Sequence, residues 1–162
     1  MTLPNQAAAP LPQDARVAID SHVLGSLHVD PRDVRTFRHG LLGFPAYRRF
    51  ALLSLTDRAG MYWLQSVDVP TLAFLLVDPF LVSDGYAVDL TDIDRHDLAV
   101  HDPADVLMLV IVTLANAADG PCTANFQGPI AINLRTGLGK QLVLAESPLG
   151  VRTPVDLSRF VA

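Results

Sequence analysis

The sequence predicts an all-β, mainly antiparallel single domain that closes into a small β-barrel and carries one or two short helical turns. Short apolar segments recur along nearly the whole chain, and Gly, Pro, Asn and Asp separate them at the spacing typical of all-β domains. Residues 106–114 are apolar at both parities, which is typical of a central strand covered on both faces. Residues 122–134 alternate between apolar and polar side chains, which is the period of a strand with one buried face. Closure into a barrel leaves few strand edges exposed, and a β-sandwich is the alternative arrangement.

The chain length is sufficient for one domain with a buried core, at 162 residues. Residues 1–15 are rich in Ala, Pro and Gln, so we expect them to form a mobile tail and residues 16–162 to form the domain. The chain shows neither an apolar run of about 20 residues nor the basic start and apolar stretch of a signal peptide. We therefore expect a cytoplasmic protein without membrane contact.

The expected strands follow one another from the end of the tail to the C-terminal region. In chain order they are residues 16–20, 34–38, 50–55, 61–67, 72–77, 86–90, 106–114, 122–134 and 140–144. Residues 23–29 also alternate, although Gly25 weakens the pattern. We expect the helical turns at residues 92–98, where Asp92 is placed to cap them and the neighbouring aspartates favour the positive N-terminal end.

The strand expected at residues 122–134 carries amide side chains on one parity. Gly128 and Pro129 fall in its middle, so the strand is expected to bend or break once there. Asn125, Gln127 and Asn133 share the parity opposite to the apolar side chains, and uncharged amides suit specific hydrogen bonds to a protein partner. The alternative is that these amides satisfy neighbouring backbone groups.

Charge is distributed unevenly, with a formal net charge of −5 that argues against binding to a phosphate backbone. Five arginines lie within residues 32–49, whereas seven aspartates lie within residues 84–105 against a single arginine. The two regions either serve different partners or fold against each other.

Patterns of catalysis, metal binding and nucleic-acid binding fail one by one. The chain has no Gly-x-Ser-x-Gly elbow, and residues 137–140 depart from the phosphate-loop pattern and predict a hairpin turn. Residues 92–97 lack the glycine and the closing glutamate of a calcium loop. With one lysine and 7% aromatic residues, the chain lacks the basic groove with stacking aromatic side chains that binds nucleic acid. We predict that the protein is not an enzyme and that it binds no metal and no cofactor. The alternatives are a small ligand- or oligonucleotide-binding barrel and an enzyme with an unrecognised site.

Several segments resemble, in this order, the FliW family of flagellar assembly factors. They are Phe37-x-x-Gly40-Leu41-Leu42-Gly43-Phe44, Phe50-x-Leu52-Leu53, Trp63-Leu64-Gln65-Ser66, Ala73-Phe74, Asp78-Pro79-Phe80, Val110-Ile111-Val112-Thr113, Thr123-Ala124-Asn125-Phe126-x-Gly128-Pro129-Ile130-x-Ile132-Asn133 and Gln141-x-Val143-Leu144. Together they extend over about residues 17–152. Their shared order is more specific than any one of them.

The resemblance implies a small cytoplasmic β-barrel protein, monomeric when free, that is not an enzyme. It implies binding of flagellin before export and binding of the translational repressor CsrA, which relieves the repression of flagellin mRNA. A basic, RNA-binding partner is attracted to negative charge, which also repels RNA. We therefore predict that the CsrA-facing surface includes Asp89, Asp92, Asp94 and Asp97.

Overall fold

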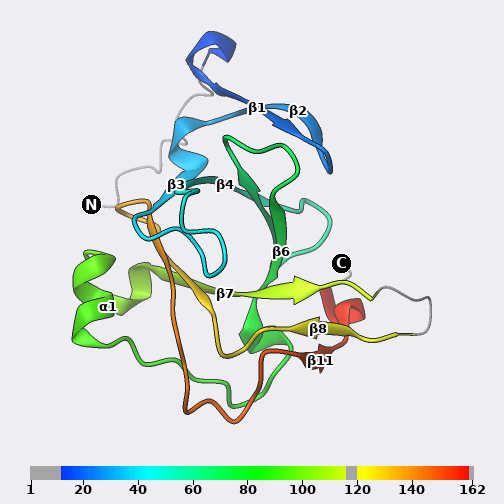
Figure 1. Ribbon diagram of the computed structural model, residues 1–162, viewed down its shortest axis with the longest axis vertical. Helices are drawn as coiled ribbons and strands as arrows, with labels where there is room; N and C mark the ends of the chain where they lie inside the picture. Colours follow the sequence, from blue (N-terminus) through cyan, green and yellow to red (C-terminus); the bar gives the residue numbers. More distant parts are fainter. Residues whose placement is uncertain (1–11, 116–119, 161–162) are drawn as a thin grey trace, which may run out of the picture.

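The computed structural model describes residues 12–115 and 120–160. Its strands curl around a common core, with the short helix α1 (Asp92–Asp97) on one side and the hairpin of β1 (Val17–Ser21) and β2 (Gly25–Val29) at one end (Figure 1). Of the tail predicted over residues 1–15, residues 1–11 lie outside the described residues, and Gln13–Ala15 form a 3-10 turn.

Within the described residues, seven strands close a barrel, as the sequence predicts. They are β3 (Val34–Phe37), β4 (Arg49–Ser54), β5 (Met61–Ser66), β6 (Ala73–Val77), β7 (Val106–Thr113), β9 (Ile130–Asn133) and β10 (Leu138–Gln141). The order around the barrel is β7-β6-β5-β4-β3-β10-β9, and β9 pairs back to β7. All of these pairings are antiparallel except the one between β10 and β3, which is parallel.

Strand β7 is the central strand that its apolar sequence predicts. Its residues 106–109 pair with β9, residues 110–112 pair with β6, and residues 112–113 pair with β8 (Cys122–Ala124). Strand β11 (Thr153–Val155) pairs with β8 and extends the sheet beyond the barrel. The β1–β2 hairpin forms a sheet of its own.

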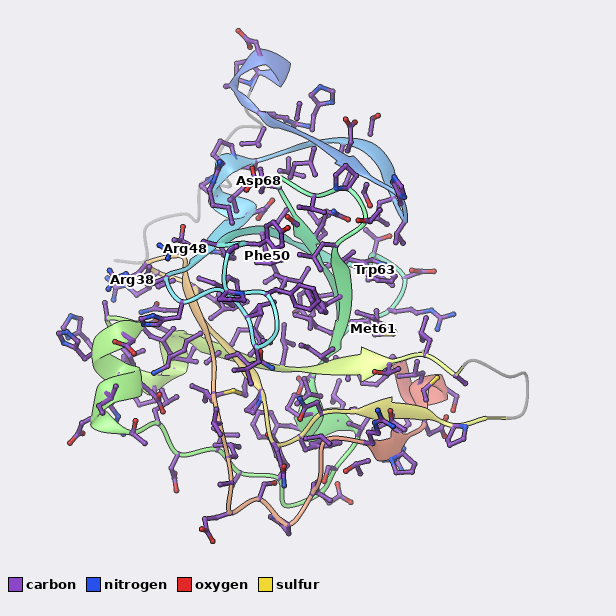
Figure 2. All side chains as sticks on the ribbon, viewed as in Figure 1. Arg38, Arg48, Phe50, Met61, Trp63 and Asp68 are labelled. Atoms are coloured by element: carbon purple, nitrogen blue, oxygen red, sulfur yellow. The ribbon has the colours of Figure 1, made fainter. Side chains whose placement is uncertain are left out.

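The two faces of the barrel wall bury separate groups of apolar side chains. Phe37 and Phe50 meet edge to face inside the barrel with ring centroids 5.5 Å apart, and Figure 2 shows Phe50 in the middle of the molecule. On β6, Leu76 faces this interior, whereas Leu75 and Val77 face an outer cluster with Tyr86, Phe126 and Phe160. This alternation is the two-residue period from which the strands are predicted.

Three expectations for the elements are corrected. The strand predicted at residues 86–90 has no strand partner among the described residues, although burial alternates along it with Tyr86 buried and Ala87 exposed. The hairpin turn predicted at residues 137–140 lies at residues 134–136 instead, because residues 138–141 form β10. Thr91, rather than Asp92, caps α1. The single break expected in the strand at residues 122–134 is confirmed, since a turn at residues 125–129 separates β8 from β9.

Smaller connections complete the described chain. Single 3-10 turns occur at Pro31–Asp33, Pro79–Leu81, Pro103–Asp105 and Leu157–Phe160. In the part of the chain that the structure describes, no helix is long and apolar enough to cross a membrane.

Candidate partner-binding surface

Three segments that are distant in the sequence meet on the side of the molecule that carries α1. They are the loop of residues 38–45, the helix α1 and the strand β10, and we name the surface that they form the α1 face. Lys140 of β10 contacts α1, and His39 of the loop lies 3.9 Å from Asp97 of α1. Between the loop and β10 lies a hollow of about 410 Å³, lined by residues 39–43, Pro45 and residues 139–141.

The helix α1 begins with a capping box. The Thr91 side-chain oxygen accepts a hydrogen bond from the Asp94 backbone N–H, and the Asp94 carboxylate accepts one from the Thr91 N–H, both at 3.1 Å. Acidic side chains lie in the first turn and basic ones in the last, as the helix dipole favours. A helix of six residues is nevertheless too short to persist alone, so contacts with the barrel must stabilise it.

Lys140, the single lysine of the sequence, connects α1 to the barrel. Its Nζ donates hydrogen bonds to Asp94 at 2.8 Å and to Asp97 at 2.7 Å. Burial disfavours the charge of Asp94, but hydrogen bonds from Lys140 and Thr91 outweigh burial and lower its pKa. The hydrogen bond from Lys140 likewise lowers the pKa of Asp97. Burial also disfavours the charge of Lys140, but the hydrogen bonds to the two carboxylates raise its pKa.

The four aspartates predicted to face CsrA therefore divide into two pairs. Asp94 and Asp97 are partly buried, and the lysine neutralises much of their charge. Asp89 and Asp92 are exposed. Of these four aspartates, the exposed pair offers most of the free negative charge to a partner.

The arginine-rich segment lies near the acidic one. Figure 2 shows Arg38 and Arg48 on the same side of the molecule as α1, and both are exposed. The contact between His39 and Asp97 joins the two segments directly. The basic and acidic regions therefore adjoin at this point, on one side of the molecule.

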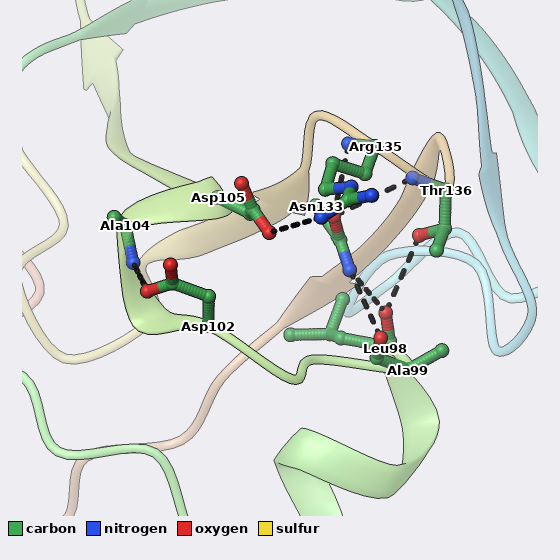
Figure 3. Close-up of polar contacts among 8 residues, drawn as sticks. All are labelled: Leu98, Ala99, Asp102, Ala104, Asp105, Asn133, Arg135 and Thr136. Atoms are coloured by element: carbon green, nitrogen blue, oxygen red, sulfur yellow. Dashed lines mark hydrogen bonds and ion pairs between the residues drawn. The ribbon is translucent and has the colours of Figure 1, made fainter.

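Asn133 does not face outward, so the expectation from its parity is wrong. Its side chain is only 2% exposed, and its Nδ2 donates to the carbonyls of Leu98 at 2.9 Å and Ala99 at 3.2 Å (Figure 3). Its Oδ1 accepts from the backbone N–H groups of Arg135 and Thr136. Asn133 thus joins the end of α1 to the turn after β9.

Two more aspartates of the acidic region have structural partners in Figure 3. The Asp102 carboxylate accepts a hydrogen bond from the Ala104 N–H at 2.9 Å, which caps a 3-10 turn. The Asp105 carboxylate lies 3.8 Å from the Arg135 guanidinium. The acidic run in the sequence is therefore only partly a free surface.

The amides of Asn125 and Gln127 lie in the turn between β8 and β9. The Asn125 side-chain oxygen accepts hydrogen bonds from the N–H groups of Gln127 and Gly128, so it stabilises the turn that it occupies. Gln127 is half-buried. The role of Gln141 was not predicted from the sequence. Its amide donates a hydrogen bond to the Gly128 carbonyl at 3.0 Å and accepts one from the Leu42 N–H at 2.9 Å. Gln141 thereby connects this turn to the loop of residues 38–45.

That loop exposes apolar side chains, which sequence reasoning also missed. Leu42 is 61% exposed and Phe44 is 36% exposed, while the Phe44 ring still packs edge to face on Phe74. Gly40 has a φ of +63°, and a Cβ there would lie 2.6 Å from the Phe44 carbonyl oxygen. Only glycine fits the tight bend that presents Leu42. The sequence signal was the pair of leucines between Gly40 and Gly43.

Comparison with known proteins identifies the family. The family model described as the FliW protein matches residues 18–155, which is most of the chain. The chain belongs to the FliW family. This confirms the resemblance seen in the sequence over about residues 17–152.

Individual FliW proteins show the same similarity. A flagellar assembly factor FliW of Moorella thermoacetica is 41% identical over 120 residues, which are 74% of this chain and 76% of the relative. One from Leptospira interrogans serogroup Icterohaemorrhagiae serovar copenhageni is 32% identical over 145 residues, 90% of this chain and 97% of the relative. A crystal structure of the flagellar assembly factor FliW aligns with a TM-score of 0.76 and 34% identity, covering 85% of this chain and 95% of the other.

The FliW match includes all three parts of the α1 face, since residues 38–45, 92–97 and 138–141 lie within the matched residues. Among residues 12–115 and 120–160, no three His, Cys, Asp or Glu side chains are arranged to hold a metal ion. What the α1 face of this FliW protein offers is exposed charge next to exposed apolar side chains, which suits contact with another protein.

Proposed function

We propose that this protein is a cytoplasmic flagellar assembly factor that acts by binding other proteins and not by catalysis. It binds flagellin before export, and it binds the translational repressor CsrA and so relieves the repression of flagellin mRNA. The observation that carries this proposal is the match to the FliW family over residues 18–155.

The α1 face and Asp89, which lies just before α1 in the chain, support the CsrA part of the proposal. Asp89 and Asp92 are exposed, and Ile93 of α1 is 70% exposed beside them in the sequence. Interfaces between proteins bury apolar side chains at their centre and place charges at the rim. A basic RNA-binding protein is drawn to the carboxylates, which repel the RNA phosphates that compete for it.

Regulation requires only that the two partners compete. If flagellin lowers the affinity for CsrA, then CsrA lowers the affinity for flagellin by the same factor. Flagellin that awaits export then releases CsrA to act as a repressor, and secretion of flagellin reverses the exchange.

Separate titrations of the purified protein with CsrA, flagellin and flagellin mRNA test the proposal. We expect calorimetry to show binding to both proteins and none to RNA, and flagellin to displace bound CsrA. Binding to RNA alone with a steep dependence on salt supports the oligonucleotide-binding alternative instead. Failure to bind either protein refutes the proposal.

The exposed pair is tested by the double variant Asp89→Asn/Asp92→Asn, and the single variant Asp92→Asn tests α1 alone, because Asp89 also lines a second hollow. We expect CsrA to bind about twofold to thirtyfold more weakly at low salt, because two exposed charges that contribute about 0.2–1 kcal/mol each add to about 0.4–2 kcal/mol. The salt dependence of the affinity should become flatter as well. Asp94 and Asp97 are left unchanged, because they hold α1 in place.

The matched control is Asp57→Asn/Asp68→Asn, which removes the same charge from two exposed loop positions outside the α1 face. It should bind CsrA like the unmodified protein. Equal weakening by both double variants would mean that only net charge matters, and would exclude the α1 face as the site.

A ligand-carrying barrel receives no support from the interior. The inside of the barrel is filled by fully buried side chains, among them Phe37, Phe50, Leu64 and Leu109. Small barrels filled in this way leave no room for a ligand.

A further inference from the structure

A second hollow, separate from the one on the α1 face, lies between residues 83–89 and residues 143–149 and has a volume of about 620 Å³. In Figure 1 these two segments, green before α1 and orange after β10, run along the end of the molecule away from β1 and β2. Apolar side chains contribute to the lining, including Tyr86, Leu144 and Leu149. We name this hollow the end groove.

All the charged side chains that line the end groove are negative. Its lining includes the carboxylates of Asp84, Asp89 and Glu146 and, among these described residues, no Lys, Arg or His. Asp84, Asp89 and Glu146 are exposed. The groove therefore favours a ligand that is cationic as well as apolar.

One side of the groove is a segment without a strand partner among the described residues. Burial alternates along residues 86–89, and within the described part of the chain residues 84–90 make no backbone–backbone hydrogen bond. The segment is nevertheless held in place, because the Tyr86 hydroxyl donates to the Phe126 carbonyl at 2.8 Å. It therefore has the burial pattern of a strand but pairs with none among the described residues.

The other side of the groove is the chain that continues beyond β10, and this chain has one free edge. The N–H groups of Leu142 and Leu144 donate inward to the carbonyls of Pro129 at 2.8 Å and Gln127 at 2.7 Å. Successive N–H groups of an extended chain point to opposite edges, so the Val143 N–H and C=O point away from those partners. Val143 lines the groove, is 72% exposed and makes no backbone–backbone hydrogen bond among the described residues.

We propose that the end groove binds an extended, basic segment of a partner protein, which adds as a β-strand to the edge at Val143. Backbone hydrogen bonds to that edge give affinity, and alternating side chains give specificity. Apolar side chains of the segment meet Tyr86 and Leu149, while its lysines or arginines meet the three carboxylates. This inference goes beyond the proposed function, because it neither names nor requires CsrA or flagellin.

The basic strand of the chain itself is not available as the occupant. The arginine-rich segment around Arg35 forms β3, which is paired on both edges, with β4 and with β10. A second copy would have to open its barrel to supply that strand. The occupant therefore comes from a different protein.

The probe is a synthetic eight-residue peptide of alternating lysine and valine with blocked ends. We expect titration into the isotope-labelled full chain to shift the NMR signals of residues 84–90 and 143–147. The same peptide with every backbone nitrogen methylated keeps its charge but lacks N–H donors, and it should bind at least tenfold more weakly. Equal binding of both peptides, or shifts confined to other surfaces, overturns the proposal, as does the absence of shifts at millimolar peptide.

Variants of the protein test the same edge from the other side. Val143→Pro removes the outward N–H donor, and prolines are tolerated on edge strands, so the fold should persist while peptide binding falls at least tenfold. Val143→Ala keeps the N–H and should bind within about twofold of the unmodified protein. If both variants bind the peptide equally well, strand addition at this edge is wrong. If the proline variant does not fold, the comparison with the methylated peptide decides the question.

Discussion

Two side chains fix α1 on the barrel, and they come from neighbouring strands. Asn133 of β9 binds the carbonyls at the C-terminal end of α1, and Lys140 of β10 binds carboxylates in its first and last turns. Neither role can be predicted from the residue type or its spacing, because each depends on what the fold places opposite the side chain. The alternative considered for the amides, that they satisfy backbone groups, applies to Asn133 and Asn125.

Asn133→Ala should lower the free energy of unfolding by about 2–4 kcal/mol, because it leaves buried carbonyl and N–H groups without partners. Urea denaturation measures the change. Gln127→Ala, at a half-buried position of the same parity, should cost less than about 1 kcal/mol. Equal losses for the two variants would contradict the structural role of Asn133.

Lys140→Met should change how the free energy of unfolding depends on pH. In the folded protein the pKa values of Asp94 and Asp97 are lowered and that of Lys140 is raised. The carboxylates therefore stabilise the fold fully above their unfolded pKa of about 4, and this contribution disappears as the pH falls through the lowered values. The lysine contributes fully below about pH 10.4, and its contribution is lost as the pH rises through the raised value.

The measurement is the free energy of unfolding between pH 2 and pH 8. We expect Lys140→Met to be less stable than the unmodified protein at pH 7 and to lose less stability on acidification, since its carboxylates have no lysine to lose. Arg152→Met, which removes an exposed cation from a loop outside the α1 face, serves as the control and should keep the slope of the unmodified protein. Parallel pH profiles for all three proteins would show that the lysine does not set the carboxylate pKa values.

At the scale of the elements, the two-residue period is a reliable guide to strands but not to their partners. It predicts the strands of the barrel and the central place of β7, and it also predicts a strand at residues 86–90, where burial alternates without strand pairing. On β9 both faces are covered, since Ile130 and Ile132 face the barrel interior and Ala131 packs with Leu98 beyond α1. The rule that polar residues face outward fails there, because a distant helix covers the second face.

No local sequence pattern indicates the parallel pairing of β10 with β3. This pairing depends on Gly139. A Cβ at Gly139 would lie 2.5 Å from the Phe37 ring, inside the buried core. Gly139→Ala should therefore cost about 1–3 kcal/mol through overpacking. In chemical denaturation, Gly150→Ala serves as the control, since nothing lies within 4 Å of a Cβ there. A neutral Gly139→Ala would mean that Phe37 moves aside freely.

At the scale of the whole molecule, the closed barrel and the β1–β2 hairpin should differ in cooperativity. Each barrel strand pairs with neighbours on both sides, so opening one strand breaks the closure of the sheet. The hairpin pairs with no other strand among the described residues. It is attached through an apolar cluster around Ile19, Val29 and Ala51 and through the hydrogen bond from the His22 N–H to the Pro70 carbonyl at 2.9 Å. An isolated two-stranded hairpin is only marginally stable in water.

Hydrogen exchange in the native state, followed at increasing urea, separates these two modes. Amides of β1 and β2 should exchange by local opening, with a free energy at least about 2 kcal/mol below that of β5 and little dependence on low urea, because local opening exposes little surface. Amides of β5 should exchange only through global unfolding and accelerate steeply with urea. If the two sets merged at every urea concentration, the hairpin would be an integral part of the barrel's cooperative unit, and the apolar cluster beneath it would be sufficient to hold it there.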